Sequence, residues 1–419
     1  MIRNYIAALM CSLATVGSVS AQVLTLDTCY ARAYKNYPLI KQHDLVDKTR
    51  EYTLSNASKA YLPQVSITAI EGYVFGGLPS FGAPGSESSN FKFIGVAQVN
   101  QTIWDGGATK VQKKIIEASS EADEAALEVS LYDLYSRVNQ LYFGILLVDE
   151  QLAQLEIRDK ILSNNVSRLQ QLNDNGLAYK TDVDEIRVEQ LKLKQQQAEF
   201  MYTRNGYAMM LSLLIGADVD AQAVLQKPTM NDAIEKVPVI RPELTLYKYQ
   251  RELISAQGGM QKVSMMPKIG ILGAGVMLAP GIGADASGTS YIGVAGLSAS
   301  WSIGGLYKNG NEKHLTEQSL NKVNLQEETF LFNTRMKVTQ TYANIEKQRE
   351  ILEQDDEIVA LRTRIREGYQ LKYDNGAGTL MDLLNATENE SDARAQKTLH
   401  EMQLLTTIAD QKVTTGNVK

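Results

Sequence analysis

Histidine and glycine-rich motifs are the parts of this sequence most often used for catalysis, and their spacing argues against it. The three histidines, His43, His314 and His400, lie far apart, without the spacing typical of a metal site or a catalytic triad. The stretch GIGADASG (281–288) has neither the lysine of a P-loop nor the glycine spacing of a Rossmann turn. We therefore expect no enzyme activity, no cofactor and no metal.

Two carboxylates recur at the same distance from a polar turn. Asp182 ends the stretch DNGLAYKTD, and Asp382 ends the stretch DNGAGTLMD in the second half of the chain. An Asn-Gly pair after a helical pattern is typical of a left-handed residue that ends a helix and reverses the chain. Thr379 and Asp382 match a capping box, as do Thr181 and Asp184. Helix capping is one explanation for the aspartates that follow the two turns. A second role for them at the tip of a helical hairpin is also open.

Composition and the N-terminus narrow the class of protein. The formal net charge is −6, so we expect no nucleic-acid partner. The first residues contain an arginine, an apolar run from 6 to 16 and a final Val-Ser-Ala, which predicts a signal peptide cleaved after Ala21. Cys11 leaves with that peptide, and Cys29 is then the only cysteine, so no internal disulfide is possible.

Long helices are the elements that must position the two turns. Over 108–173 there is no proline, and apolar residues follow the 4-3 spacing of a coiled-coil seam. A second helical pattern runs from Thr181 to about Ile215, and the plan repeats over 312–372 and about 380–413, where Ile351, Ile358 and Ile365 lie seven apart. We interpret the stripes of 108–173 and 181–215 as core packing between helices. The first seam comprises Leu134, Val138, Leu141, Ile145, Val148, Leu152, Leu155, Leu162, Val166 and Leu169.

Four strand-like stretches lie between the helical patterns, at 63–77, 91–104, 267–280 and 290–303. The alternation in 290–303 predicts a strand with one apolar face and with Ser298, Ser300 and Ser302 on the other face. Imperfect alternation across the four stretches is expected of membrane strands. Outside the signal peptide no run reaches ~18 consecutive apolar residues, so any membrane crossing would have to be made by strands. The predicted apolar face comprises Tyr291, Ala295, Leu297, Ala299, Trp301 and Ile303.

The chain reads as a duplication. NYPL (36–39) corresponds to RPEL (241–244), and the two halves repeat a helix, a β-hairpin, a long helix, a polar turn and a return helix. Four strands cannot close a transmembrane barrel, and open edges are excluded from lipid, so a barrel would have to be shared between chains. The segments we predict are a signal peptide (1–21), a helical segment (22–61), β-hairpin 1 (62–104), helical hairpin 1 (105–215), a connector (216–238), a helical segment (239–264), β-hairpin 2 (265–305), helical hairpin 2 (306–413) and a tail (414–419).

Several of these motifs resemble the TolC family of outer-membrane efflux proteins. QTIWDGG (101–107) is similar to the family's strand-to-helix signature Q-P-L-F-D-G-G, and SASWSIGG (298–305) is similar to its second copy. SKAYLPQVSI (58–67) resembles the family's Leu-Pro start of the first strand. NGLAYKTDV and NGAGTLMDLLNA resemble its two tip motifs, so the likeness spans nearly the whole chain after the signal peptide.

The resemblance implies a fold and a function. The fold is an α+β membrane protein whose duplicated helical hairpins and two β-hairpins trimerise into a 12-stranded β-barrel continued by an α-helical periplasmic tunnel. The function is the outer-membrane duct of a tripartite efflux pump or type I secretion system in a Gram-negative bacterium. Its partners are two further copies of the chain, a periplasmic adaptor, an inner-membrane RND or ABC pump and outer-membrane lipid. The alternative, a soluble periplasmic coiled-coil scaffold or adaptor, explains the helices but not the two hairpins.

The resemblance also implies site residues at the periplasmic end. Asp382, Tyr373 and Asp182 match positions of the family's closed mouth, where Asp382 would form a ring of three carboxylates. The second acid of the motif is replaced by Asn385, and the arginine of the family's latch by Gly378. We therefore expect a mouth held more by packing and hydrogen bonds than by ion pairs. The residues expected to contact the adaptor are Asn175, Gly176, Leu177, Asn375, Gly376 and Ala377.

Overall fold

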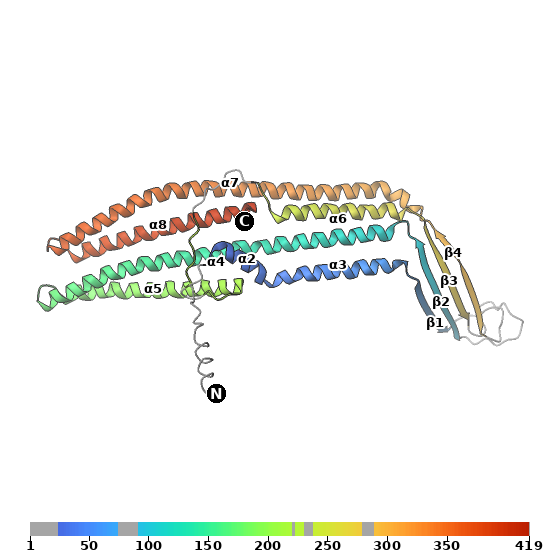
Figure 1. The fold of residues 1–419 in the computed structure, drawn as a ribbon, viewed down its shortest axis with the longest axis horizontal. Helices are drawn as coiled ribbons and strands as arrows, with labels where there is room; N and C mark the ends of the chain where they lie inside the picture. The colour runs from blue at the N-terminus through green and yellow to red at the C-terminus, as the bar shows by residue number, and fades with distance from the viewer. Residues whose placement is uncertain (1–23, 74–90, 220–222, 230–237, 279–288, 419) are drawn as a thin grey trace, which may run out of the picture. The chain divides into compact units, whose positions relative to one another are not determined.

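The computed structural model describes residues 24–73, 91–219, 223–229, 238–278 and 289–418, and its elements are labelled in Figure 1. The predicted signal peptide (1–21) lies outside these residues. The chain forms two compact units, which we name the sheet unit (Lys41–Glu128 and Glu243–Thr329) and the hairpin unit (Met1–Ile40, Val129–Pro242 and Phe330–Lys419).

Among the described helices, none combines the length and the apolar composition needed to cross a membrane.

The sheet unit contains one antiparallel sheet of four strands in the order β1-β2-β3-β4. Both β-hairpins therefore join edge to edge through β2 and β3, and β1 and β4 are left as the two edges. The strands are β1 (Gln64–Tyr73), β2 (Phe91–Trp104), β3 (Lys268–Leu278) and β4 (Ser290–Ser300). Its helices are α3 (Gln42–Ser58), the short 3-10 helix η2 (Lys59–Tyr61), α6 (Pro242–Ser264) from Glu243 onward, and the first parts of α4 (Ala108–Asp174) and α7 (Gly304–Asp374).

The last strand is shorter than the sequence predicts. β4 ends at Ser300, and helix α7 begins at Gly304. Tyr291 to Ala299 alternate within the strand as expected, but Trp301 and Ile303 lie beyond its end. The indole nitrogen of Trp301 instead donates a hydrogen bond of 2.9 Å to the carbonyl oxygen of Met265.

A single carboxylate organises the junction between β2 and the long helix α4 (Ala108–Asp174). Asp105 accepts hydrogen bonds from the backbone N–H of Gly107 (2.9 Å) and of Thr109 (2.7 Å), and from the hydroxyl of Tyr61 (2.8 Å). Burial alone would raise the pKa of the Asp105 carboxyl. The hydrogen bonds from Thr109, Tyr61 and Gly107 outweigh burial and lower the pKa to about 2. Gly106 and Gly107 adopt φ of 72° and 93°, which few other residues tolerate, so the Asp-Gly-Gly sequence has a local structural reason.

The hairpin unit contains two antiparallel helix pairs. In the first, α4 pairs with α5 (Lys180–Ile215), and in the second α7 (Gly304–Asp374) pairs with α8 (Leu380–Thr415). The core packing predicted for the α4 seam is confirmed, since seven of its ten members are buried and the other three are half-buried. The buried members are Leu134, Val138, Ile145, Val148, Leu155, Leu162 and Leu169.

The stripe of α7 is not buried in the same way within the chain. Ile358 and Ile365 are 45% and 44% exposed, so they are not core residues of the chain. The face that α7 turns toward α8 is partly polar instead: Asp355 lies 2.7 Å from His400, and Gln348 hydrogen-bonds Gln403 at 3.0 Å. A heptad stripe marks an apolar surface, but it does not say whether the partner helix belongs to the same chain.

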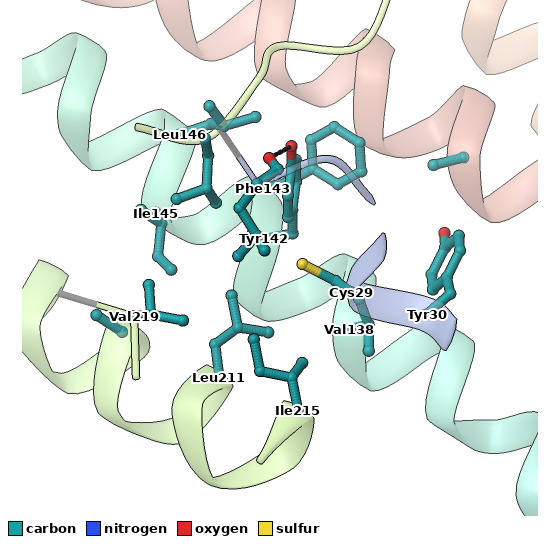
Figure 2. Close-up of a cluster of buried hydrophobic side chains, with 14 of the residues drawn as sticks. Cys29, Tyr30, Val138, Tyr142, Phe143, Ile145, Leu146, Leu211, Ile215 and Val219 are labelled. Atoms are coloured by element: carbon teal, nitrogen blue, oxygen red, sulfur yellow. Dashed lines mark hydrogen bonds between the residues drawn. The ribbon is translucent and has the colours of Figure 1, made fainter. Parts of the chain in front are cut away.

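The main apolar core of the hairpin unit joins the N-terminal helix α2 (Leu26–Asn36) to both helix pairs. Figure 2 shows Cys29 and Tyr30 of α2 in one cluster with residues of α4, α5 and the connector. The hydroxyl of Tyr142 lies 2.8 Å from the carbonyl oxygen of Leu24 and 2.6 Å from that of Gln226, so it ties two extended segments to α4. Further members of the cluster are Val138, Phe143, Ile145, Leu146, Leu211, Ile215, Val219, Met402, Leu405 and Ala409.

The two copies of the duplication close their return helices with different chemistry. The side-chain amide of Asn36 donates to the carbonyl oxygens of Leu213 (3.1 Å) and Leu214 (3.2 Å), at the end of α5. Arg241, from the corresponding motif of the second half, donates to the carbonyl oxygen of Val413 (3.2 Å) at the end of α8. The motifs NYPL and RPEL therefore share a role in satisfying helix C-termini, which their spacing alone does not reveal. The 3-10 turn η1 (Pro38–Lys41) follows the first of them.

Candidate functional site at the hairpin tips

The two predicted turns have the same backbone structure. After α4, the N–H of Leu177 donates to the carbonyl oxygen of Leu172 at 2.8 Å, and after α7 the N–H of Ala377 donates to that of Lys372 at 2.9 Å. Gly176 and Gly376 have φ of 72° and 71°. This six-to-one hydrogen bond with a left-handed glycine is the Schellman motif, and it satisfies carbonyls that the helix leaves free. The paired Asn-Gly turns thus have a structural basis.

The turns also present side chains to solvent. All six residues predicted to contact an adaptor are exposed, and Leu177 is 75% exposed. Tyr179, which the sequence analysis did not select, is 80% exposed beside it. The amide side chains of Asn175 and Asn375 donate back to their own helices, at 2.8 Å and 2.9 Å, so they hold the turns rather than extend from them. Leu177 and Tyr179 therefore give the first tip an apolar surface.

Asp382 has the predicted capping role. Its backbone N–H donates to the hydroxyl oxygen of Thr379 at 3.1 Å, and its carboxylate lies 2.7 Å from the same hydroxyl. The carboxylate also accepts a weak hydrogen bond of 3.4 Å from the Thr379 N–H, which completes the capping box at the start of α8. Asp382 is nevertheless exposed, so capping leaves its charge accessible to solvent.

The capping box predicted at Thr181 and Asp184 was wrong. Helix α5 begins at Lys180, its N-cap is Tyr179, and no side chain caps it. The register of the duplication gives the reason, because Tyr179 occupies the place of Thr379 and its hydroxyl lies at the far end of the ring, away from the helix N–H groups. Asp182 occupies the place of Asp382 in the first turn of the helix, where a negative charge is favoured by the helix dipole.

Tyr373 packs between the two hairpins. It contacts a cluster of buried apolar residues that includes Leu169, Val183, Ile186 and Leu380, drawn from both helix pairs. Burial raises the pKa of the Tyr373 hydroxyl, Arg168 lowers it, and Asp182 and Asp374 raise it again. The structure therefore brings Tyr373 and Asp182 into the same region.

Two arginines of α4 form ion pairs that the sequence analysis did not anticipate. Arg168 pairs with the carboxylate of Asp374 and donates to its backbone oxygen at 3.1 Å, and Arg158 pairs with Glu388 of α8. Within one chain the hairpins are thus joined by charge as well as by packing. No pattern within either helix indicates these pairs, because they depend on how the two hairpins pack. The one available signal in the sequence was Asp374, the acidic residue of the second D-N-G turn, which pairs with Arg168.

Gly378 and Asn385, the two departures from the family pattern, have distinct surroundings. A Cβ atom at Gly378 would lie 3.1 Å from the Cβ of Lys372, so glycine lets the turn close on the last turn of α7. Asn385 lines an open groove of about 420 Å³ with charged side chains of α4, α5 and α8. The lining residues are Arg158, Glu185, Glu189, Lys192, Leu193, Gln196, Met381, Leu384, Asn385 and Glu388.

A buried carboxylate lies farther along the second hairpin. Glu390 is 5% exposed and accepts hydrogen bonds from the hydroxyl of Thr363 and from Nε of Arg366, both at 2.8 Å, and from Arg394 at 2.8 Å. Burial raises the pKa of the Glu390 carboxyl, but its hydrogen bonds to Arg366, Arg394 and Thr363 and the positive charge of Arg366 lower it overall. In the part of the chain that the structure describes, no group of three or more His, Cys, Asp or Glu side chains could hold a metal ion.

No protein-family profile and no curated protein sequence matches this chain. Solved structures do. The outer membrane protein VceC from Vibrio cholerae covers 94% of this chain and 97% of its own length, with a TM-score of 0.66 and 13% identity. The chain has the fold of this outer membrane protein. The CmeC outer membrane channel of Campylobacter jejuni covers 94% of this chain and 86% of its own, with a TM-score of 0.64 and 14% identity. The open state of the MtrE outer membrane channel of Neisseria gonorrhoeae covers 94% and 89%, with a TM-score of 0.63 and 14% identity.

These likenesses extend over helices and strands together, so the fold class predicted from the motifs, with two helical hairpins and two β-hairpins per chain, is confirmed. The identities of 13–14% carry the fold but not the individual site residues. The roles of Asp382, Asn385, Tyr373 and Asp182 at a mouth, and of the exposed turns as a docking surface, stay predictions.

Proposed function

We propose that the protein is an outer-membrane duct: three copies share one 12-stranded barrel and carry solutes through an α-helical periplasmic tunnel. In this role it works with a periplasmic adaptor and an inner-membrane RND or ABC pump of a tripartite efflux or type I secretion system. The pump supplies the energy, and the duct performs no chemistry.

The observation that carries the proposal is the four-stranded sheet. Its two outer strands, β1 and β4, each leave one edge of backbone N–H and C=O groups without a strand partner in the described chain. Apolar side chains such as Ile67 and Leu297 are both 80% exposed on it. Lipid would cover such apolar surface, but it cannot satisfy open edges, so the sheet suits a membrane only when neighbouring copies pair β4 with β1.

The exposed stripe of α7 supports the same assembly. Ile358 and Ile365 lie seven residues apart and nearly half exposed, and Phe332 is 62% exposed on the same helix. Apolar residues at heptad spacing fit a second helix, and within the chain α8 leaves these side chains exposed. Helices of a neighbouring copy would bury them.

Two measurements test the duct. Native mass spectrometry in detergent should find three chains per particle, and planar bilayers containing the purified protein should show single-channel conductance. A monomer that is soluble without detergent and gives no conductance would refute the duct and would support the soluble scaffold.

At the tunnel mouth, we infer that Asp382 contributes one carboxylate per chain to a ring that attracts cations. Its exposure beside the capping box supports this role, while Asn385 supplies no second ring of charge. Divalent cations should block the wild-type conductance, and Asp382→Ala should weaken that block. Asp382→Asn separates charge from capping, because its amide oxygen still accepts a hydrogen bond. Equal block in the wild type and Asp382→Asn would refute the ring.

At the tips, we infer that Asn175, Gly176, Leu177, Asn375, Gly376 and Ala377 form the adaptor-docking surface, with Leu177 as an apolar anchor. A cysteine at Leu177 should crosslink to a periplasmic protein in the producing bacterium, identified by mass spectrometry. Leu213→Cys is the matched control, because Leu213 is 80% exposed on the same hairpin but at the other end of α5. Equal crosslinking of the two variants to the same protein would contradict the tip as the dock.

A further inference from the structure

The register of the sheet sorts its side chains into two faces. Paired residues point to the same side, so Val65, Val99, Gly273 and Ala295 form one row of the first face. The second face, described from the end where the strands meet the long loops, begins with Gly72 paired with Lys92 and ends with Lys268 paired with Ser300, and five rows lie between these two pairs. The first two rows are Ile70, Ile94, Leu278 and Ser290, then Thr68, Val96, Val276 and Ile292. The next three are Ser66, Gln98, Ala274 and Val294, then Gln64, Asn100, Leu272 and Gly296, then Thr102, Gly270 and Ser298.

The first face has the composition of a lipid-facing surface. Aliphatic side chains occupy its middle rows, including Ile67, Val99 and Leu297, which are 80%, 41% and 80% exposed. Aromatic residues lie toward the loop end, where Tyr73 and Tyr291 are 45% and 75% exposed. An apolar band with an aromatic girdle is typical of the outside of a membrane barrel. Glu71 and Gln101 are the polar exceptions, and each lies near one end of its strand.

The second face must then line the lumen, and its polarity changes along the strands. Toward the helix end it carries the polar residues Gln98, Asn100 and Ser298, and it ends at Lys268. These groups would be costly in lipid. In the two rows that follow Gly72 and Lys92 from the loop end, six of the eight side chains are Ile, Val or Leu. Barrel interiors that conduct water are usually polar throughout, so these rows depart from the usual pattern. We name them the apolar collar: Ile70, Ile94, Val96, Val276, Leu278 and Ile292.

We propose that the apolar collar is a solute-binding and selectivity region of the duct, which favours the apolar part of amphiphilic solutes over small hydrated ions at the loop end of the barrel. The inference rests on the proposed function, because three copies must close the barrel before the second face can become a lumen. In a closed trimer the six residues would recur three times around the wall.

Exposure within the sheet agrees with this assignment. At the edges of the collar Ile70 and Ile292 are 59% and 55% exposed, so no other described part of the chain covers them. On the central strands Ile94, Val96 and Val276 are half-buried among their cross-strand neighbours, which makes the collar a continuous apolar surface. An ion that passes such a surface loses part of its hydration without gaining a polar partner, whereas an alkyl chain gains by leaving water.

Block of the single-channel current by alkyltrimethylammonium ions tests the collar. In the wild type, block should strengthen with each methylene added between tetramethylammonium and decyltrimethylammonium, approaching about fourfold per methylene if burial is complete. Val276→Ser combined with Ile292→Ser should reduce this dependence on chain length and raise the conductance of small ions. Met277→Ser combined with Leu297→Ser is the matched control on the same two strands, since these residues face lipid.

Each outcome decides between the proposals. If the wild type conducts and both serine pairs leave its chain-length dependence unchanged, the collar is refuted while the duct stands. If the control pair changes the block as much as the collar pair, the assignment of the faces is refuted. A wild type that forms no channel refutes the duct and the collar together.

Cysteine labelling tests the assignment of the two faces even if a double serine variant fails to assemble. Ile292→Cys should react with a water-soluble maleimide in proteoliposomes, whereas Gly293→Cys on the opposite face should be protected by lipid. The background is low because burial raises the pKa of the Cys29 thiol to about 12. Protection of position 292 together with labelling of position 293 would overturn the proposal.

Discussion

Replacement of Asp105 by Asn should loosen the start of α4. In the folded chain the Asp105 carboxylate accepts from the backbone N–H of Gly107, just before α4, from that of Thr109 in its first turn, and from the hydroxyl of Tyr61. An amide has one oxygen in place of two and turns an N–H₂ group toward one of these donors. The N–H of Gly107 or of Thr109 would then lose its acceptor. The loss is costly because residue 105 is only 8% exposed, so water has little access to the free N–H.

The magnitude follows from the ionisation of the carboxyl. The fold lowers the pKa of Asp105 from 3.8 to about 2, and each pKa unit corresponds to about 1.4 kcal/mol, so the ionised group stabilises the junction by about 2 kcal/mol. Because the folded pKa lies below the unfolded one, this contribution is fully present above pH ~4 and is lost as the pH falls toward 2.

Amide hydrogen exchange at neutral pH measures the effect where it acts. Peptides that span 105–111 should exchange about thirtyfold faster in Asp105→Asn, the factor that corresponds to about 2 kcal/mol. Tyr61→Phe, which removes one of the three donors, should give a smaller increase, and Asp123→Asn, an exposed carboxylate of the same helix, should give none. Thermal stability of the wild type and Asp105→Asn should converge between pH 4 and pH 2. Equal exchange at neutral pH would refute the role given to this carboxylate.

Two further substitutions test the second hairpin. Glu390→Gln leaves the charges of Arg366 and Arg394 without their acceptor and should destabilise the α7–α8 contact by about 1–2 kcal/mol, less than for a fully buried pair because Arg394 is 34% exposed. The lowered pKa of Glu390 means that its contribution is present above the unfolded pKa and is lost as the pH falls through the folded one, which amide exchange in α8 at two pH values would detect. Gly376→Ala should cost about 1 kcal/mol from backbone strain alone, since φ is 71° and no atom lies within 4 Å of the added Cβ. Gly176→Ala should match it, and proteolysis at the tip that stays unchanged in both variants would contradict this reasoning.

The parts of the fold that the sequence predicted are those set by local rules. The seam of α4 is apolar at 4-3 spacing and lies against helices of the same chain, so periodicity was enough to find its core. The two turns follow from Asn-Gly after a long helix, and both glycines have the left-handed φ expected of them. Asp382 completes its capping box because Thr379 supplies the hydroxyl that the motif needs.

The failures share a physical cause, which is dependence on a partner that a single helix does not specify. The stripe through Ile358 and Ile365 has the same periodicity as a buried seam, yet no helix in the described part of the chain covers it. Arg168 and Asp374 are ordinary surface residues until the hairpins pack together. The false capping box at Thr181 came from a local match, while the register of the duplication pointed to Tyr179 and Asp182 instead.

The polar residues in helix contacts were equally hidden. Glu390 lies in a helix rich in charged residues, and only its position opposite Thr363 and Arg366 distinguishes it from a solvent-exposed glutamate. Asn36 and Arg241 belong to the corresponding motifs NYPL and RPEL of the two halves, but their roles at the ends of α5 and α8 depend on tertiary packing.

The open edges of β1 and β4 also have a kinetic consequence. If the chain becomes a duct only when β4 of one copy pairs with β1 of the next, encounter between chains comes before insertion of the sheet. The rate at which channels form should then rise more steeply than in proportion to chain concentration. At low concentration a monomer with a folded hairpin unit, which has its own apolar core, would accumulate as an intermediate. Expression level, and not only sequence, would then determine how much of the protein reaches a membrane.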